Sequence, residues 1–105
     1  MKLKETVKRI IKEEQTSIQN LSSMSLSEIA QLIYADYRKN KKPFDYAAAP
    51  YLEALATMQT ISDNYGLDSG SSIVAYLLSN LQTWKGDVAR EVKKELNRRL
   101  KFASR

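Results

Sequence analysis

The stretch that decides the fold is SGSSIVAYLLSNLQTW, residues 69–84. It is the most apolar part of the chain, and no Lys or Arg occurs between Glu53 and Lys85. Its aliphatic side chains recur at the spacing of one helix face, which predicts a buried α-helix. Burying five such side chains contributes on the order of 10 kcal/mol before conformational entropy is subtracted. We therefore expect residues 69–84 to be the central helix. The aliphatic positions are Ile73, Val74, Leu77, Leu78 and Leu81.

Turn signals flank this stretch on both sides. Gly66 stands where a helix ends in a left-handed residue, and Asp68 is a typical N-cap of the next helix. Gly86 and Asp87 repeat the pattern, which predicts that one helix ends and another begins there. Pro50 suits the first turn of a helix. The flanking helices are therefore expected at residues 50–65 and 88–102.

An earlier helix is predicted from a capping box. Ser25 and Glu28 have the spacing at which a hydroxyl and a carboxylate bond each other's backbone N–H groups. The helix should run over residues 25–39 and end before Pro43, because proline disfavours helical geometry in the residue before it. Asp36 is expected to point away from the core.

The first 24 residues are less clearly part of the bundle. Residues 2–20 have an amphipathic helical pattern, and two interpretations stay open: a core helix, or an arm that is loosely attached. Their apolar stripe would also suit a homodimer. The predicted fold is an all-α, compact bundle of four to five short helices. Residues 25–105 form the bundle domain, and residues 1–24 form the N-terminal amphipathic helix.

Composition argues against catalysis. The 105 residues suit a single domain, and they include neither cysteine nor histidine. Disulfides and thiolate sites are thus excluded, and the commonest general base and metal ligand is missing. The segment DNYGLDSG resembles a calcium loop, but its alternate positions after Asp63 are Tyr65 and Leu67. We expect no enzyme, and no catalytic, metal or cofactor site.

No segment has the length and apolarity of a membrane span, and the N-terminus lacks the apolar core of a signal peptide. The expected location is the cytoplasm.

The net charge of +5 is unevenly placed. Residues 85–105 carry eight Lys and Arg against three acids, whereas residues 50–84 carry three acids and no cation. A basic last helix can bind nucleic-acid phosphates, or it can simply be a solvated face. Both interpretations stay open. The candidate contacts to nucleic acid or an acidic partner are Lys41, Lys42, Arg90, Lys93, Lys94, Arg98 and Lys101.

Six tyrosines and one tryptophan are a high aromatic load for this length. Such side chains anchor protein interfaces, although they also pack in cores. Those near the two prolines are the candidate protein-binding residues, and they are Tyr34, Tyr37, Tyr46 and Tyr51.

Several segments resemble a family of small, mostly uncharacterised proteins from phages and prophages of Gram-positive bacteria. The matching segments are SEIAQLIYADYR (27–38), PYLEAL (50–55), ISDNYGLDSGSSIVAYLL (61–78) and TWKGDVAREVKKEL (83–96). The resemblance covers roughly three-quarters of the chain, and residues 1–24 and the loop around Pro43 depart from it.

The resemblance implies a small helical accessory protein that works in an infected or lysogenic bacterium. Such proteins commonly act by binding and redirecting a host component, so it implies a protein partner and no catalytic residue. One specific variant is an anti-CRISPR-like inhibitor of a bacterial defence nuclease. Many such inhibitors mimic nucleic acid with an acidic surface, and the net charge of this chain opposes that mode except around residues 50–84.

Overall fold

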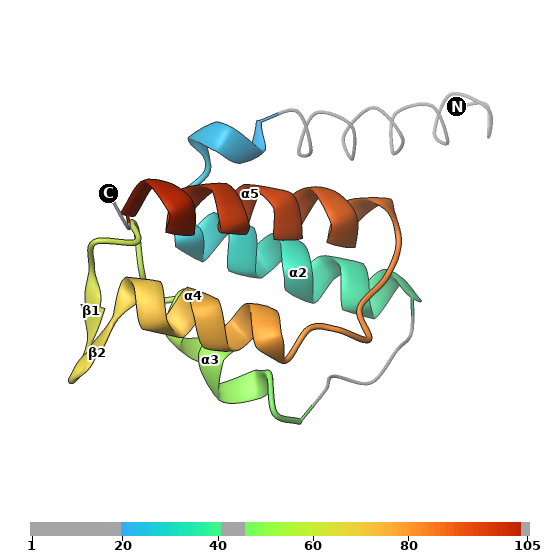
Figure 1. Cartoon of the computed structure of the whole chain (residues 1–105). Coiled ribbons are helices and arrows are strands. Elements are labelled where there is room, and N and C mark those ends of the chain that lie inside the picture. Colours follow the sequence, from blue (N-terminus) through green and yellow to red (C-terminus); the bar gives the residue numbers. More distant parts are fainter. Residues whose placement is uncertain (1–19, 41–45, 104–105) are drawn as a thin grey trace, which may run out of the picture.

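The computed structural model describes residues 20–40 and 46–103 of the chain. Figure 1 shows α5 and α2 stacked above α4 and α3, with a β-hairpin at the left end. The fold is mostly helical, but the hairpin makes the prediction of a strictly all-α fold wrong. The elements are the 3-10 helix η1 (Leu21–Ser23), α2 (Leu26–Asn40), α3 (Ala49–Leu55), β1 (Asn64–Tyr65), β2 (Asp68–Ser69), α4 (Gly70–Ser79) and α5 (Asp87–Ala103).

The start of α2 confirms the predicted capping box. The Glu28 N–H donates to Ser25 Oγ at 3.1 Å, and the Ser25 N–H donates to Glu28 Oε1 at 3.0 Å. The Ser25 N–H, followed by the Ser25 hydroxyl, favours the ionised carboxylate and lowers the pKa of Glu28. The next N–H groups, of Leu26 and Ser27, donate to the carbonyls of Gln59 and Met58. The unpaired donors of the helix end are thus bonded to the segment that follows α3.

The helix predicted over residues 50–65 is wrong at its C-terminal end, because α3 stops at Leu55. Pro50 does lie in its first turn, as predicted. Beyond it, the Thr57 hydroxyl donates to the Ala54 carbonyl at 2.7 Å, and the Asp63 carboxylate accepts the N–H groups of Gln59 and Thr60. Short polar side chains thus take backbone groups that a longer helix would use.

Gly66 lies in a hairpin turn and not at the end of a helix. Tyr65 pairs with Asp68 across the antiparallel strands, so the connecting turn has two residues, Gly66 and Leu67. Two-residue hairpin turns favour a positive φ at the first of these positions, and Gly66 has a φ of 63°. The predicted left-handed conformation is therefore present, although its assignment to a helix C-terminus is wrong.

The central helix is shorter than predicted. Ser69, and not Asp68, caps α4, because its Oγ accepts the Ser72 N–H at 3.1 Å. The helix ends at Ser79 instead of residue 84, and Gly86, with a φ of 112°, lies in the connection to α5. The extent of α5 agrees with the prediction of residues 88–102 to within one residue at each end.

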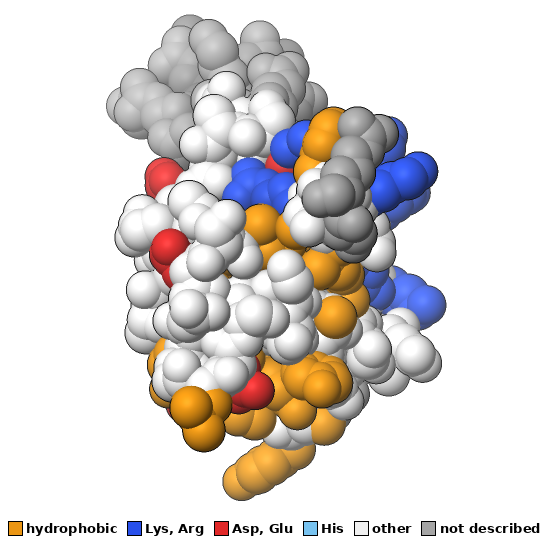
Figure 2. Space-filling model, turned by 60° about the vertical axis from the view of Figure 1, so that its left-hand side comes forward, with side chains coloured by type: hydrophobic (Ala, Val, Ile, Leu, Met, Phe, Trp, Pro, Cys, Tyr) orange, Lys and Arg blue, Asp and Glu red, His pale blue; other side chains and the backbone are white. Residues whose placement is uncertain are grey.

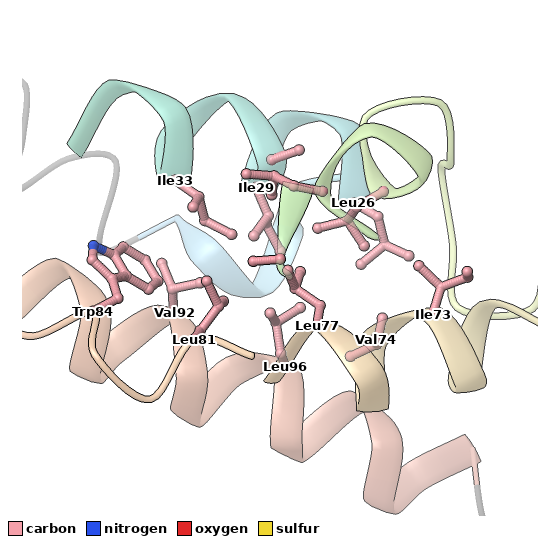
Figure 3. Packing of buried hydrophobic residues seen from close by; sticks show 14 of the residues in the cluster. Leu26, Ile29, Ile33, Ile73, Val74, Leu77, Leu81, Trp84, Val92 and Leu96 are labelled. Atoms are coloured by element: carbon pink, nitrogen blue, oxygen red, sulfur yellow. The ribbon is translucent and has the colours of Figure 1, made fainter. Parts of the chain in front are cut away.

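The core is continuous from Ile73 to Trp84, which lie at opposite ends of the labelled side chains in Figure 3. Leu81 and Trp84 are buried although they follow the end of α4. The prediction that Asp36 points away from the core is wrong, because Asp36 faces the core and is 9% exposed. Its Oδ2 accepts the indole N–H of Trp84 at 2.8 Å, so the buried carboxylate has a partner.

Residues 21–24 are packed on the domain. Leu21 is buried, and Arg99 of α5 donates to the carbonyls of Leu21 and Met24 at 2.7 and 2.8 Å. The predicted N-terminal helix over residues 2–20, with its candidate dimer stripe, lies outside the described residues apart from Asn20.

Candidate binding surfaces

The tip of the hairpin presents apolar side chains to solvent. Leu67 is 107% exposed, as much as in an extended peptide, and Tyr65 is 47% exposed. We call these two residues the hairpin tip. Leu67 lies in the two-residue turn, and Tyr65 is the last residue of β1 before it, in the hairpin that Figure 1 shows at one end of the helices. The Leu67 side chain contributes nothing to folding, since it is as exposed to water as in the unfolded chain.

The base of the hairpin is held firmly. The Gly70 N–H donates to the Asp63 carbonyl at 2.7 Å, while the Asp63 carboxylate bonds the N–H groups of Gln59 and Thr60. These two N–H groups lower the pKa of Asp63. A Cβ on Gly70 would lie 2.4 Å from the Ile61 carbonyl oxygen, so only glycine fits there. The tip is thus carried on an ordered base.

Two tyrosines, one from α3 and one from α4, lie against each other. The rings of Tyr51 in α3 and Tyr76 in α4 have centroids 5.4 Å apart with a 34° tilt, and Tyr76 is about half exposed. This is a tilted aromatic contact of the kind that also occurs in interfaces. It leaves part of each ring available to a partner.

Both features belong to residues 50–84, which contain Glu53, Asp63 and Asp68 but no cation. Figure 2 shows the face that carries the hairpin: hydrophobic side chains gather in its lower part, and Lys and Arg side chains lie in its upper and right-hand parts. The apolar area therefore has acidic neighbours, whereas the cations are concentrated around α5.

The structure separates the four predicted interface tyrosines. Tyr46 is 93% exposed, and Tyr34 and Tyr51 are half-buried. Burial, followed by the nearby charge of Glu53, raises the pKa of Tyr34. Tyr37 is only 3% exposed and stacks on Trp84 with centroids 5.7 Å apart, so it belongs to the core and cannot contact a partner.

Sequence reasoning did not select the hairpin tip or Tyr76, because it placed Tyr65 and Tyr76 within helices and Leu67 in a short connection between two helices. The signal that could have found the tip is the order Asn64-Tyr65-Gly66-Leu67-Asp68-Ser69. A glycine at the first position of a two-residue loop, bounded by Asn, Asp and Ser, is typical of a hairpin.

The predicted cations of α5 fall into two groups. Arg90 donates to Asp87 at 2.8 Å, Lys93 donates to the Trp84 carbonyl at 2.7 Å, and Arg98 bonds Glu95 at 2.6 Å. Lys94 and Lys101 are exposed. Lys41 and Lys42 lie outside the described residues. Three of the five predicted cations of α5 thus bond other groups of the domain.

Glu95 joins this helix to the start of the described chain. It is almost buried, and it accepts bonds from Arg98 and Arg99, both of which lower the pKa of Glu95 against the opposing effect of burial. Arg99 also holds Leu21 and Met24. In each of these contacts both the donor and the acceptor belong to the domain itself, so the contacts hold parts of the fold together.

Within the described ranges, no cluster of three or more Asp or Glu residues could hold a metal ion. None of the helices seen there combines the length and apolarity needed to cross a bilayer. Comparisons with known protein families, curated proteins and solved structures find no match to this chain.

Proposed function

We propose that the protein is a non-enzymatic interaction protein, of phage origin, that binds and modulates a host or phage macromolecule. The observation that carries the proposal is the full exposure of Leu67 beside Tyr65 on a turn with an ordered base. Exposed apolar side chains on a pre-organised element are typical of docking sites, because little conformational entropy is lost on binding. The phage origin rests on the sequence resemblance.

The chemistry around the tip defines the kind of partner. Leu67 and Tyr65 call for an apolar pocket, while Asp68, which pairs with Tyr65 across the hairpin, favours a basic rim. A protein surface with an apolar hollow and Lys or Arg around it meets both requirements.

A narrower candidate is a defence nuclease, whose nucleic-acid channel is basic. The feature that favours this candidate is the absence of Lys and Arg from residues 50–84. An acidic and apolar face without cations can approach the basic channel of a nuclease without electrostatic repulsion. The inhibitor would act in the cytoplasm of an infected or lysogenic bacterium. Its net charge of +5 requires local rather than overall mimicry of nucleic acid.

Affinity capture with three versions of the protein tests the proposal. The immobilised wild type, Leu67→Lys and Gln31→Lys proteins are exposed to lysate of a Gram-positive host. Gln31 is exposed on α2, so its variant adds the same charge away from the tip. The expected result is a protein retained by the wild type and Gln31→Lys but lost by Leu67→Lys. Equal retention by all three, or by none, contradicts the proposal.

A further inference from the structure

A depression of about 240 Å³ lies where α5 begins. It is far from the hairpin, because Figure 1 shows the connection from α4 to α5 at the opposite end of the molecule. Its mouth is open at Gly86, where a Cβ would meet nothing within 4 Å. The lining residues are Trp84, Lys85, Gly86, Ala89, Arg90 and Lys93.

The lining is strongly cationic. Three of its six residues are Lys85, Arg90 and Lys93, and no carboxylate is among them in the described part of the chain. Charges of one sign around a concave surface raise the local potential and attract counter-ions. The depression therefore has the electrostatics of an anion site.

Lys93, one of the lining residues, is held in place by Trp84. Its ammonium donates to the Trp84 carbonyl at 2.7 Å and lies 6.0 Å from the centroid of the Trp84 ring. An ammonium has three N–H donors, so two remain for a ligand. Because the side chain is already ordered, binding an anion would cost little further rotamer entropy.

Lys85 lies close enough to Lys93 for their charges to interact. The pKa of Lys93 is lowered first by burial and then by the charge of Lys85. Two like charges held together raise each other's energy, and an anion between them would relieve this repulsion.

Glu91 Oε1 lies 4.0 Å from Arg90 Nε. The carboxylate that competes more closely for Arg90 is that of Asp87, whose Oδ1 accepts from Arg90 Nη2 at 2.8 Å. Both side chains are largely exposed, and exposed ion pairs contribute little to stability. Arg90 can therefore turn part of its guanidinium to a ligand without a large loss. The positive end of the α5 dipole, which begins at Asp87, adds to the attraction.

We infer that this depression, the α5 anion pocket, binds a phosphate group. Three cations at one site match a phosphate monoester, which carries about −1.5 to −2 charges at neutral pH and several strong acceptor oxygens. The phosphate can come from a small phosphorylated metabolite, where it is a monoester, or from the backbone of a nucleic acid, where it is a diester with a single negative charge. This site is independent of the hairpin tip.

Trp84 is the one tryptophan of the chain, and it lines the pocket, so its fluorescence reports on the site. Inorganic phosphate is titrated into the whole protein while sodium chloride is lowered to keep ionic strength constant. A saturable change in Trp84 emission is expected. The double variant Lys85→Gln/Arg90→Gln should weaken binding about tenfold or more, because charged hydrogen bonds are lost.

The matched control is Lys94→Gln/Arg38→Gln, which removes the same charge from exposed positions outside the pocket. It should bind phosphate as the wild type does. Circular dichroism and thermal midpoints verify that both double variants fold. If the wild type shows no saturable change, the proposed phosphate site is wrong. It is also wrong if both double variants weaken binding equally, since that result would mean diffuse charge attraction.

A nucleoside monophosphate and a single-stranded oligonucleotide distinguish the two sources. Tight binding of the monophosphate alone identifies a metabolite. Tighter binding of the oligonucleotide, falling steeply with salt, identifies a nucleic-acid backbone. Either result supports the α5 anion pocket if the double variant Lys85→Gln/Arg90→Gln no longer binds the ligand. If the double variant still binds both ligands, the pocket is contradicted.

Discussion

The indole N–H of Trp84 donates to the carboxylate of Asp36 across 48 residues of sequence, at 2.8 Å and out of contact with solvent. Tyr37, the neighbour of Asp36, stacks on the same indole ring. One residue of the connection between α4 and α5 is therefore held by two consecutive residues of α2. This joins the end of α2 to the start of the last helix.

Replacing Asp36 with alanine should lower the free energy of unfolding by about 2 kcal/mol, because the buried indole N–H loses a charged acceptor. Urea denaturation measures the change. Asp36→Asn, which keeps an acceptor oxygen, should lose less. If alanine and asparagine cost the same small amount, the hydrogen bond does not stabilise the fold.

Gly70→Ala should destabilise the protein by about 1–3 kcal/mol, although alanine is the better helix former. The new Cβ would lie 2.8 Å from the Asp63 carbonyl oxygen and 2.4 Å from that of Ile61, and backbone atoms cannot move aside cheaply. Thermal unfolding provides the measurement. Ser71→Ala, one position further in the same helix, should be nearly neutral, and an equally mild Gly70→Ala would disprove the close approach.

Stability should fall as the pH drops below about 4.5, the usual pKa of a glutamate, because the pKa of Glu95 is lowered in the folded state. The unfolded chain then takes up the proton first, so the stabilisation present at neutral pH is lost on acidification. Glu95→Gln should be less stable at pH 7 by about 1–2 kcal/mol.

Urea titrations of wild type and Glu95→Gln at several pH values measure this dependence. The variant should keep part of the slope, since Glu28 and Asp63 also have lowered pKa values. Parallel curves for the two proteins would show that Glu95 does not contribute.

Two leucines only ten positions apart should differ strongly in how much stability the same change removes. Leu77 is 0% exposed, so Leu77→Asn should cost about 4 kcal/mol or more, a large part of a total stability of roughly 5–15 kcal/mol. Leu67→Asn should change stability by less than about 0.5 kcal/mol, because that side chain is wet in both states. Circular dichroism against urea distinguishes them. A large loss for Leu67→Asn would mean that the hairpin tip packs on the domain.

Local signals predicted part of this structure well. The capping box of Ser25 and Glu28, the first turn at Pro50 and the extent of α5 all depend on residues within a few positions of one another. The same local signal was misleading at Tyr51–Tyr65, where helical spacing continued past Leu55. There the side chains of Thr57 and Asp63 bond the backbone and end the helix.

The candidate surfaces were harder to predict, because the exposure of a side chain depends on residues that are distant in the sequence. Tyr37 and Tyr46 are both tyrosines near the loop, yet one is buried against Trp84 and the other is exposed. The cations of α5 were expected from the sequence, but which of them bond Asp87, Glu95 or a backbone carbonyl depends on the fold.

By itself, the sequence determined that one apolar face of residues 69–84 is buried, that Gly66 has a positive φ and that the last helix is basic, because spacing and residue type suffice for each. Only the tertiary structure decided that the buried stretch is a shorter helix, α4, followed by Leu81 and Trp84 in an irregular segment. The physical reason is that burial is a property of side chains. The backbone conformation of residues 80–86 instead depends on partners such as Asp36 and Lys93, which lie far away or in the next helix.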